Sequence, residues 1–424
     1  MTTPDGKYKI LLISDHALST SGVGTASRWL IEGMLTKNTW SFRQLGAAIK
    51  HADYSIVQVN PDFIIKPIDG FGDRDTLRLI LAQEKPDVLF IFTDPRFFIW
   101  LFEMEDEIHQ ICPIVWWHVW DNRPAPLFNS PLYEATDLLN CHSHLTYEML
   151  SNDYPPELKL AEKTHFVPHS LPEQLYHPLA QEEKSFYREK ILGVERMDHF
   201  VPIWINRNAK RKRSSDVIES WKFFLDELEV KHGHRKATLI MHTDPFDVEG
   251  PNLVSVAERL GVLNSIIFSQ ERIEFEKINV LYNISDCCMN ISYAEGFGLG
   301  TLEAMNAGIP IIAVTTGGLT RQVIDHRDGS ENGVALPVEI KSMVGSQSVP
   351  YIYEDYVSNQ SVANGLMKMY EFGPDERKRL GEKARNYVLS EFSYQKTIDD
   401  WHETLLDTVK NWRSRYKRWE AKDI

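Results

Sequence analysis

The sequence predicts an α/β protein of two domains, each built on a parallel sheet with helices on both faces. Short apolar runs, typical of buried strands, alternate with amphipathic segments typical of helices. This alternation stops at a polar, charged stretch, residues 181–198, and starts again at 199. The 424 residues also exceed what one hydrophobic core usually organises. We therefore expect an N-terminal domain over 1–180, a linker over 181–198, a second domain over 199–390 and a helical C-terminal segment over 391–424.

The expected elements follow in order along the two domains. The first domain has candidate strands at 9–14, 55–59, 87–92, 113–117 and 137–142, and candidate helices at 25–35, 74–83 and 96–110. The second has candidate strands at 200–205, 237–242, 265–268, 287–291 and 309–314, and candidate helices at 215–230, 253–260, 274–283, 299–307, 375–389 and 393–417. Strands that alternate with helices form parallel sheets, and ligands bind at the carboxyl ends of such strands. We therefore expect the site in a cleft where the loops of both domains converge.

The most informative stretch is residues 291–308, which read ISYAEGFGLGTLEAMNAG. An apolar run, a glycine-rich turn and a helix start follow one another, and this arrangement favours binding of a phosphate at the free helical N–H groups. Glu295 precedes the turn, and helical periodicity turns Glu303 toward the same loop. Because a carboxylate beside a phosphate is unfavourable, we interpret both glutamates as partners of sugar or ribose hydroxyls. An ordinary strand-to-helix turn with Glu303 in solvent is the alternative.

A second candidate group is basic and follows the strand at 200–205. Arg207 lies just beyond this strand, and Lys212 and Arg213 come five and six residues later. Cations at this edge of a sheet would neutralise a diphosphate as it leaves, which stabilises charge that develops in a transition state. A solvated basic loop is the alternative interpretation.

The complete set of residues resembles the donor site of family 4 retaining glycosyltransferases. The resemblance lies in Glu295-Gly-Phe-Gly-Leu, the spacing to Glu303, and the run Ala307-Gly-Ile-Pro310. It implies the GT-B fold, in which two Rossmann-like domains face each other across a cleft and the last helix crosses back to the first domain. It also implies that Glu295 binds the donor sugar, Glu303 the ribose, and Arg207 with Lys212 the diphosphate. The backbone of Gly296, Phe297, Gly298 and Leu299 would hold the sugar and the distal phosphate.

The same resemblance implies further contacts outside the glycine-rich turn. Gly22, in the loop after the first strand, would face the donor phosphate, and His118, at a strand end, would contact a sugar hydroxyl or orient the acceptor. Asp94 and Asp121, at similar strand ends, are acceptor-side candidates. Arg272 and Ile273 would lie near the nucleotide base, although these residues do not distinguish uracil from guanine or adenine. Arg213 stands where the family often has glycine, so its role is open.

The expected function is transfer of a sugar from a nucleoside diphosphate sugar to an acceptor hydroxyl, with no metal and no other cofactor. The acceptor is a glycan, a lipid-linked sugar or a hydroxymethylated base in DNA, and steep salt dependence of duplex binding would favour DNA. A sugar-nucleotide epimerase of the same two-lobe fold is an alternative from another class, since it would need no acceptor. A non-catalytic sensor of nucleotide sugars is a third.

Composition and charge narrow the class of protein. The net charge of −14 argues against general binding of polyanions over the whole surface. The four cysteines have no metal-ligand spacing, which favours free thiols in a reducing compartment. The N-terminus has no apolar signal core, and no apolar run approaches 18 residues, so we expect a cytoplasmic protein without stable membrane insertion. Cations and aromatics mix from Lys410 onward, which fits a packed helical face or contact with membrane or nucleic acid.

Overall fold

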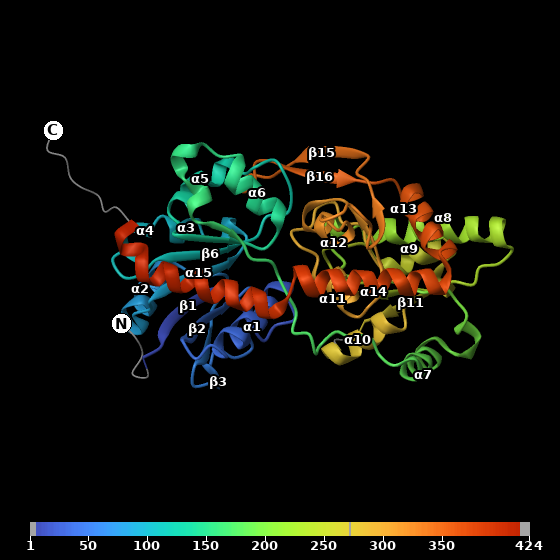
Figure 1. Ribbon diagram of the computed structural model, residues 1–424, viewed down its shortest axis with the longest axis horizontal. Helices are drawn as coiled ribbons and strands as arrows, with labels where there is room; N and C mark the ends of the chain where they lie inside the picture. Colours follow the sequence, from blue (N-terminus) through green and yellow to red (C-terminus); the bar gives the residue numbers. More distant parts are fainter. Residues whose placement is uncertain (1–5, 271–272, 416–424) are drawn as a thin grey trace. The chain divides into compact units, whose positions relative to one another are not determined.

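The computed structural model describes residues 6–270 and 273–415. These residues form two units, each of which has its own parallel sheet (Figure 1). Unit 1 takes the described residues up to Ser170, residues 345–352 and those from Gln395 on, and unit 2 takes Leu171–Val344 and Tyr353–Tyr394. Within the described chain, no helix combines the length and the apolar character needed to cross a bilayer.

Unit 1 is built on an eight-stranded sheet in the order β3-β4-β2-β1-β5-β6-β7-β8. The neighbouring strands are parallel, except that β3 pairs with β4 in antiparallel fashion. The strands are β1 (Tyr8–Asp15), β2 (Trp40–Ala47), β3 (Val57–Asn60), β4 (Phe63–Pro67), β5 (Val88–Thr93), β6 (Ile114–His118), β7 (Leu138–Cys141) and β8 (Thr164–Phe166). The helices include α1 (Gly22–Leu35), α2 (Arg74–Glu84), α3 (Ile99–Phe102), α4 (Glu105–Ile108), α5 (Ser130–Glu134) and α6 (His144–Asn152).

The last helix of the chain, α15 (Tyr394–Arg415), packs on the sheet of unit 1 (Figure 1). Trp401 is fully buried against Phe90 and Trp117, with ring centroids 4.8 and 5.3 Å away. Trp412 is also buried, and its ring lies beside His109. Trp401 and Trp412 therefore belong to a packed face of this helix.

Unit 2 is built on a six-stranded sheet in the order β11-β10-β9-β12-β13-β14, and each neighbouring pair is parallel. Its strands are β9 (Pro202–Ile205), β10 (Leu239–His242), β11 (Ile266–Ser269), β12 (Cys287–Asn290), β13 (Ile311–Val314) and β14 (Gly333–Leu336). The helices include α7 (Gln181–Leu192), α8 (Ser214–His232), α9 (Leu253–Arg259), α10 (Phe275–Asn283), α11 (Leu299–Asn306), α12 (Thr320–Val323), α13 (Asn359–Glu371) and α14 (Gly373–Glu391). A two-stranded sheet pairs β15 (Ile340–Val344) with β16 (Ile352–Tyr356).

The domain boundaries differ from those expected from the sequence. The chain leaves unit 1 at Ser170, whereas the first domain was expected to end at 180. The stretch 181–198, expected to be a linker, lies within unit 2, and its residues 181–192 form helix α7. Its sequence resembles a linker because half of its residues are charged and Leu192 is the one residue of this helix that is buried. Residues 345–352, which join β15 to β16 and include the first residue of β16, belong to unit 1.

Candidate functional site

The glycine-rich loop of unit 2 joins the carboxyl end of β12 to the first turn of α11. It turns at Gly298, whose φ of +95° lies in the region that L residues with a side chain rarely adopt. A Cβ atom at this position would also lie 2.5 Å from Cδ2 of Leu319. The helix then begins at Leu299, and the first N–H groups of any helix have no partner within it. The loop therefore presents main-chain donors at the edge of the sheet where α/β proteins bind ligands.

A buried ion pair lies beside this loop. The ammonium of Lys212, in the short helical turn Lys210–Lys212, pairs with the carboxylate of Glu295, although the two residues are 83 positions apart. Lys212 is 9% exposed and Glu295 7%. Ser292 donates a hydrogen bond of 3.1 Å to the same carboxylate oxygen. Burial alone would raise the pKa of Glu295, but the charges of Lys212 and Arg211 outweigh it and hold this pKa at about 2.

Arg211 is a second cation at the loop, and the sequence did not single it out. Its Nη1 atom donates to the main-chain oxygen of Ala294 at 3.2 Å and lies 3.7 Å from the carboxylate of Glu295. About half of its side chain is exposed. Arg211 therefore adds positive charge at the exposed side of the loop, whereas Lys212 supplies positive charge from a buried position.

The second glutamate, Glu303, lies on α11 one turn into the helix. The hydroxyl of Tyr282, on α10, donates to its Oε2 atom at 2.8 Å. Burial raises the pKa of Glu303 to about 7, against the lowering effect of the nearby hydroxyls of Tyr282 and Tyr176. A carboxylate that titrates near neutrality beside two hydroxyl groups is suited to exchange hydrogen bonds with a polyol.

We expect Glu303→Gln to change how stability depends on pH. An acid whose pKa rises on folding stabilises the protein below its unfolded pKa, and this stabilisation is lost as pH rises through the folded value of about 7. From an unfolded value of 4.5, the loss amounts to roughly 3 kcal/mol in the free energy of unfolding. Denaturant unfolding should therefore show Glu303→Gln gaining stability over wild type between pH 5 and 8, on the order of that loss. Glu258→Gln, an exposed position on α9, is the control, and equal pH slopes for wild type and Glu303→Gln would refute the assignment.

Arg207 follows β9, as the sequence indicated, but acidic residues hold it in this structure. Its Nε and Nη2 atoms donate to the two carboxylate oxygens of Asp247 at 2.7 and 3.2 Å, and Glu249 lies 3.5 Å away. The side chain is 58% exposed, so the guanidinium is anchored but accessible. Asp247, in the loop after β10, is a neighbour that could not be predicted from its local sequence.

Arg213, whose role was open, is part of the framework. It is 6% exposed, forms an ion pair with Asp216 at 2.7 Å, and stacks its guanidinium over the ring of Tyr293. It also has a left-handed backbone conformation, with φ +57°, directly before α8. That conformation explains why a glycine is suitable at such a position.

The remaining donor-side candidates fall into three groups. Gly296 and Leu299 belong to the loop around Gly298, so the fold brings them together with Glu295. Phe297 is buried and packs edge-on against Phe392, with ring centroids 5.4 Å apart, so its side chain points into the core and only its backbone serves the loop. Ile273 is partly exposed after β11, whereas Arg272 lies outside the residues that the structure describes.

In unit 1, three candidates lie at the carboxyl edge of the sheet. Gly22 begins α1, and the hydroxyl of Ser21 caps this helix by accepting from the N–H of Gly24 at 2.9 Å. Asp94 directly follows β5, where its carboxylate accepts from the N–H of Arg96 at 3.0 Å. Burial raises the pKa of Asp94, and the charge of Asp121 raises it further. The fold thus places Asp94 and Asp121 near each other.

His118 differs from the expectation of a ligand contact. It is the last residue of β6 and has no exposed surface, and its ring packs against Trp116 and Tyr133. Its Nε2 atom shares a hydrogen bond of 2.8 Å with the hydroxyl of Tyr133. Burial, and then the proximity of His142, lowers the pKa of His118 well below its usual value, so the ring is neutral. In this structure His118 is a buried residue of unit 1 that packs among aromatic side chains.

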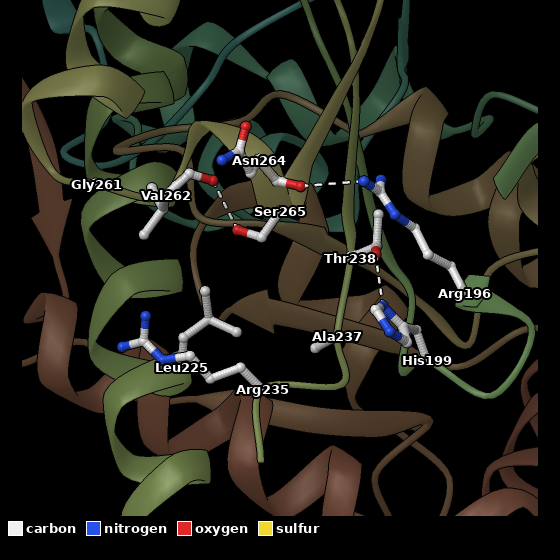
Figure 2. A pocket seen from close by; sticks show the side chains of 10 residues that line it. All are labelled: Arg196, His199, Leu225, Arg235, Ala237, Thr238, Gly261, Val262, Asn264 and Ser265. Carbon is white, nitrogen blue, oxygen red and sulfur yellow. Dashed lines mark hydrogen bonds between the residues drawn. The ribbon is translucent and has the colours of Figure 1, made fainter. Parts of the chain in front are cut away.

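A cavity of about 290 Å³ lies elsewhere in unit 2, at the opposite edge of the sheet (Figure 2). Its lining includes Thr238 and Ser265, which directly precede β10 and β11. Figure 2 shows Arg196 directed to the main-chain oxygen of Asn264, at 3.2 Å. Ligands of parallel sheets bind at the carboxyl ends of the strands, so this cavity at the amino ends is not the predicted donor site.

Comparison with known proteins bears on the segment that contains the loop. Residues 249–344 match the family model described as glycosyl transferases group 1. The chain contains a glycosyl transferases group 1 domain. N-acetyl-alpha-D-glucosaminyl L-malate synthase of Bacillus anthracis is 22% identical over 223 residues, which are 53% of this chain and 49% of that protein. D-inositol 3-phosphate glycosyltransferase of Mycolicibacterium smegmatis is 35% identical over 78 residues, 18% of each protein. The chain therefore spans about half or less of the length of these curated relatives.

Solved structures extend the similarity of the group 1 domain to the fold of nearly the whole chain. Sucrose-phosphate synthase from Thermosynechococcus elongatus has a TM-score of 0.71 at 15% identity, and covers 97% of this chain and 100% of its own. Anabaena Alr3699/HepE, solved with UDP and glucose, has a TM-score of 0.66 at 16% identity, with 94% and 100% covered. These likenesses confirm the predicted fold class, GT-B, with two Rossmann-like domains.

Proposed function

We propose that the protein is a retaining glycosyltransferase that uses a nucleoside diphosphate sugar and needs no metal ion. In the proposed reaction the bond between the anomeric carbon and the distal phosphate oxygen breaks, and the nucleoside diphosphate leaves. The acceptor oxygen bonds to the same face of the anomeric carbon, and its proton passes to the leaving phosphate. Cleavage of the anomeric bond places new negative charge on the distal phosphate before the acceptor's proton arrives, so the protein must supply positive charge there.

The observation that carries this proposal is the buried pair of Lys212 and Glu295 at the start of α11. A lysine held beside free helical N–H groups stabilises a phosphate, and the acid that neutralises it in the free protein is positioned to accept hydrogen bonds from sugar hydroxyls. On this proposal, Lys212 turns from Glu295 to the distal phosphate when the donor binds. Its attraction for the phosphate grows as charge develops, which is the condition for catalysis rather than simple binding.

The other residues take roles that follow from their surroundings. Glu303 accepts hydrogen bonds from the ribose, which favours its ionised form, so donor affinity should rise as pH increases through about 7. Arg207 contributes its exposed guanidinium to the diphosphate while Asp247 fixes its orientation. The cations Arg207 and Lys212 perform the charge neutralisation for which other transferases recruit a metal. The bound UDP and glucose of Alr3699/HepE support a nucleotide sugar as the donor class.

The test is product analysis with a panel of UDP-, GDP- and ADP-sugars and three acceptor classes: glycans, lipid-linked sugars and DNA that contains hydroxymethylated bases. We expect a glycoside to form with one donor, to keep the donor's anomeric configuration in NMR spectra, and to form equally well in EDTA. Release of an epimer or free sugar without any acceptor would instead support the epimerase. An inverted product would overturn the retaining mechanism, and loss of activity in EDTA would overturn metal independence.

A further inference from the structure

A segment packed behind the glycine-rich loop donates hydrogen bonds to main-chain oxygens of that loop. This backing segment, residues 317–322, comprises the turn Gly317–Leu319 and the start of α12. The N–H of Gly318 donates to the oxygen of Glu295 at 2.9 Å. The amide Nε2 atom of Gln322 donates to the oxygens of Phe297 and Gly298 at 2.8 and 3.2 Å. Three of the four carbonyls of residues 295–298 are therefore directed to the backing segment.

The side chain of Gln322 is itself fixed. It has no exposed surface, and the hydroxyl of Thr301 donates to its Oε1 atom at 2.6 Å. The oxygens of Phe297 and Gly298 can only accept, so the amide nitrogen must face the loop, which leaves the amide oxygen to face Thr301. The side-chain amide of Asn332 in turn donates to the main-chain oxygen of Gln322 at 2.9 Å. The donor group of Gln322 thus has a single orientation.

The glycine-rich loop and the backing segment are packed too closely to admit a side chain at Gly318. A Cβ atom on Gly318 would lie 2.4 Å from the oxygen of Gly296 and 2.6 Å from the Cα atom of Phe297. Both distances are shorter than non-bonded atoms tolerate, so the two backbones touch directly. The backing segment therefore sets the position of the loop as well as the direction of its carbonyls.

The direction of the carbonyls determines the direction of the N–H groups. In a trans peptide, the C=O of one residue and the N–H of the next point to opposite sides of the chain. The carbonyls of Phe297 and Gly298 face Gln322, so the N–H groups of Gly298 and Leu299 face away from it. These are the donors at the start of α11, where an anion binds most favourably.

We infer that Gln322, locked by Thr301, is a positioning residue that aims the N–H groups of Gly298 and Leu299 at the diphosphate of the donor. This inference rests on the proposed function, since it assigns the diphosphate to this loop. Gln322 does not touch the donor itself, because it is buried behind the loop. Its contribution is to keep two donors preorganised, which avoids the cost of ordering them when the ligand binds.

The first experiment compares a nucleotide with its nucleoside by isothermal titration, with UDP and uridine as the pair, or the pair for whichever base the wild type prefers. Gln322→Met keeps the shape of the side chain but removes both N–H donors. We expect it to weaken UDP binding roughly tenfold or more, while uridine, which lacks the diphosphate, binds as to wild type. Thr301→Val should weaken UDP binding in the same direction but less. Trp221→Phe, which loses a buried hydrogen bond to Ser265 at the far edge of the sheet, is the control for a general loss of stability.

Equal losses for UDP and uridine would show that Gln322 has only a structural role, and unchanged UDP binding would overturn the inference. A wild-type protein that binds no nucleoside diphosphate would overturn the proposed function instead.

Hydrogen exchange on the ligand-free protein then tests the positioning separately. The N–H groups of Gly318 and Leu302 donate to loop carbonyls of Glu295 and Gly298, and should exchange faster in Gln322→Met. Unchanged exchange at both would overturn the inference whatever the nucleotide result.

Discussion

Replacement of Lys212 by methionine is expected to reduce kcat/KM for the donor by roughly a hundredfold to a thousandfold. The fold buries this ammonium directly beside the loop, where low polarity strengthens its attraction for a developing phosphate charge. Because this attraction increases in the transition state, most of the loss should appear in kcat. Steady-state kinetics with the preferred nucleotide sugar measure the effect.

The matched control is Lys210→Met, two residues earlier in the same helical turn. Lys210 is exposed, so its charge is screened by water and its loss should change kcat/KM by less than about twofold. If the two variants lose activity equally, the loss in Lys212→Met would come from the change in overall charge and not from the position of this ammonium. A Lys212→Met protein with normal kcat would exclude Lys212 from the reaction.

Glu295→Gln is expected to produce the largest loss of stability at the site. It leaves the ammonium of Lys212 without its carboxylate partner in a position that is 9% exposed. Breaking one side of a buried ion pair costs about 3–5 kcal/mol in the free energy of unfolding. Lys212→Met should cost less, since Arg211 and Ser292 still contact the remaining carboxylate of Glu295.

The double variant Lys212→Met/Glu295→Gln should be more stable than the sum of the two single effects predicts, because neither charge is left alone. Urea unfolding of the wild type and the three variants gives the coupling energy. The exposed pair Arg78 and Glu107 provides the control, and its cycle should show at most about 1 kcal/mol. Strictly additive effects of Lys212→Met and Glu295→Gln would mean that the two side chains do not form the pair.

The glycine-rich loop could be predicted from the sequence because its signals are local. A strand, three alternating glycines and a helix start lie within one stretch, and the structure places Gly298 in the left-handed conformation that such a turn requires. The pairing of Lys212 with Glu295 could not be predicted. It joins positions 83 residues apart, and only the order of β9 and β12 in the sheet brings them together.

The residues that sequence reasoning missed share a different feature, since their partners are main-chain atoms or distant side chains. Gln322 is a single glutamine beyond a Gly-Gly pair, with no motif, and its importance comes from the loop carbonyls that it faces. Asp247 and Tyr282 are likewise ordinary in their local sequence. His118 is the converse, because a polar residue at a strand end resembles a site residue until the surrounding rings are seen.

Strand β2 and the helix expected over 96–110 show the same limit of prediction from local sequence. Strand β2 was not predicted, because Arg43 and Gln44 interrupt its apolar pattern. The next strand after 9–14 was expected at 55–59. The amide of Gln44 is satisfied by Ser14 and by the main chain of Asp15, so a buried glutamine is tolerated there. The helix expected over 96–110 is divided into α3 and α4, which are separated by Glu103 and Met104.

A crystal structure with a bound nucleoside diphosphate tests the account most directly. The proposal predicts the distal phosphate within hydrogen-bond distance of the N–H groups of Gly298 and Leu299, with Nζ of Lys212 turned from Glu295 to a phosphate oxygen and the ribose on Glu303. Phosphates bound away from this loop, for example in the cavity between Arg196 and Arg235, with Lys212 still on Glu295, would contradict it.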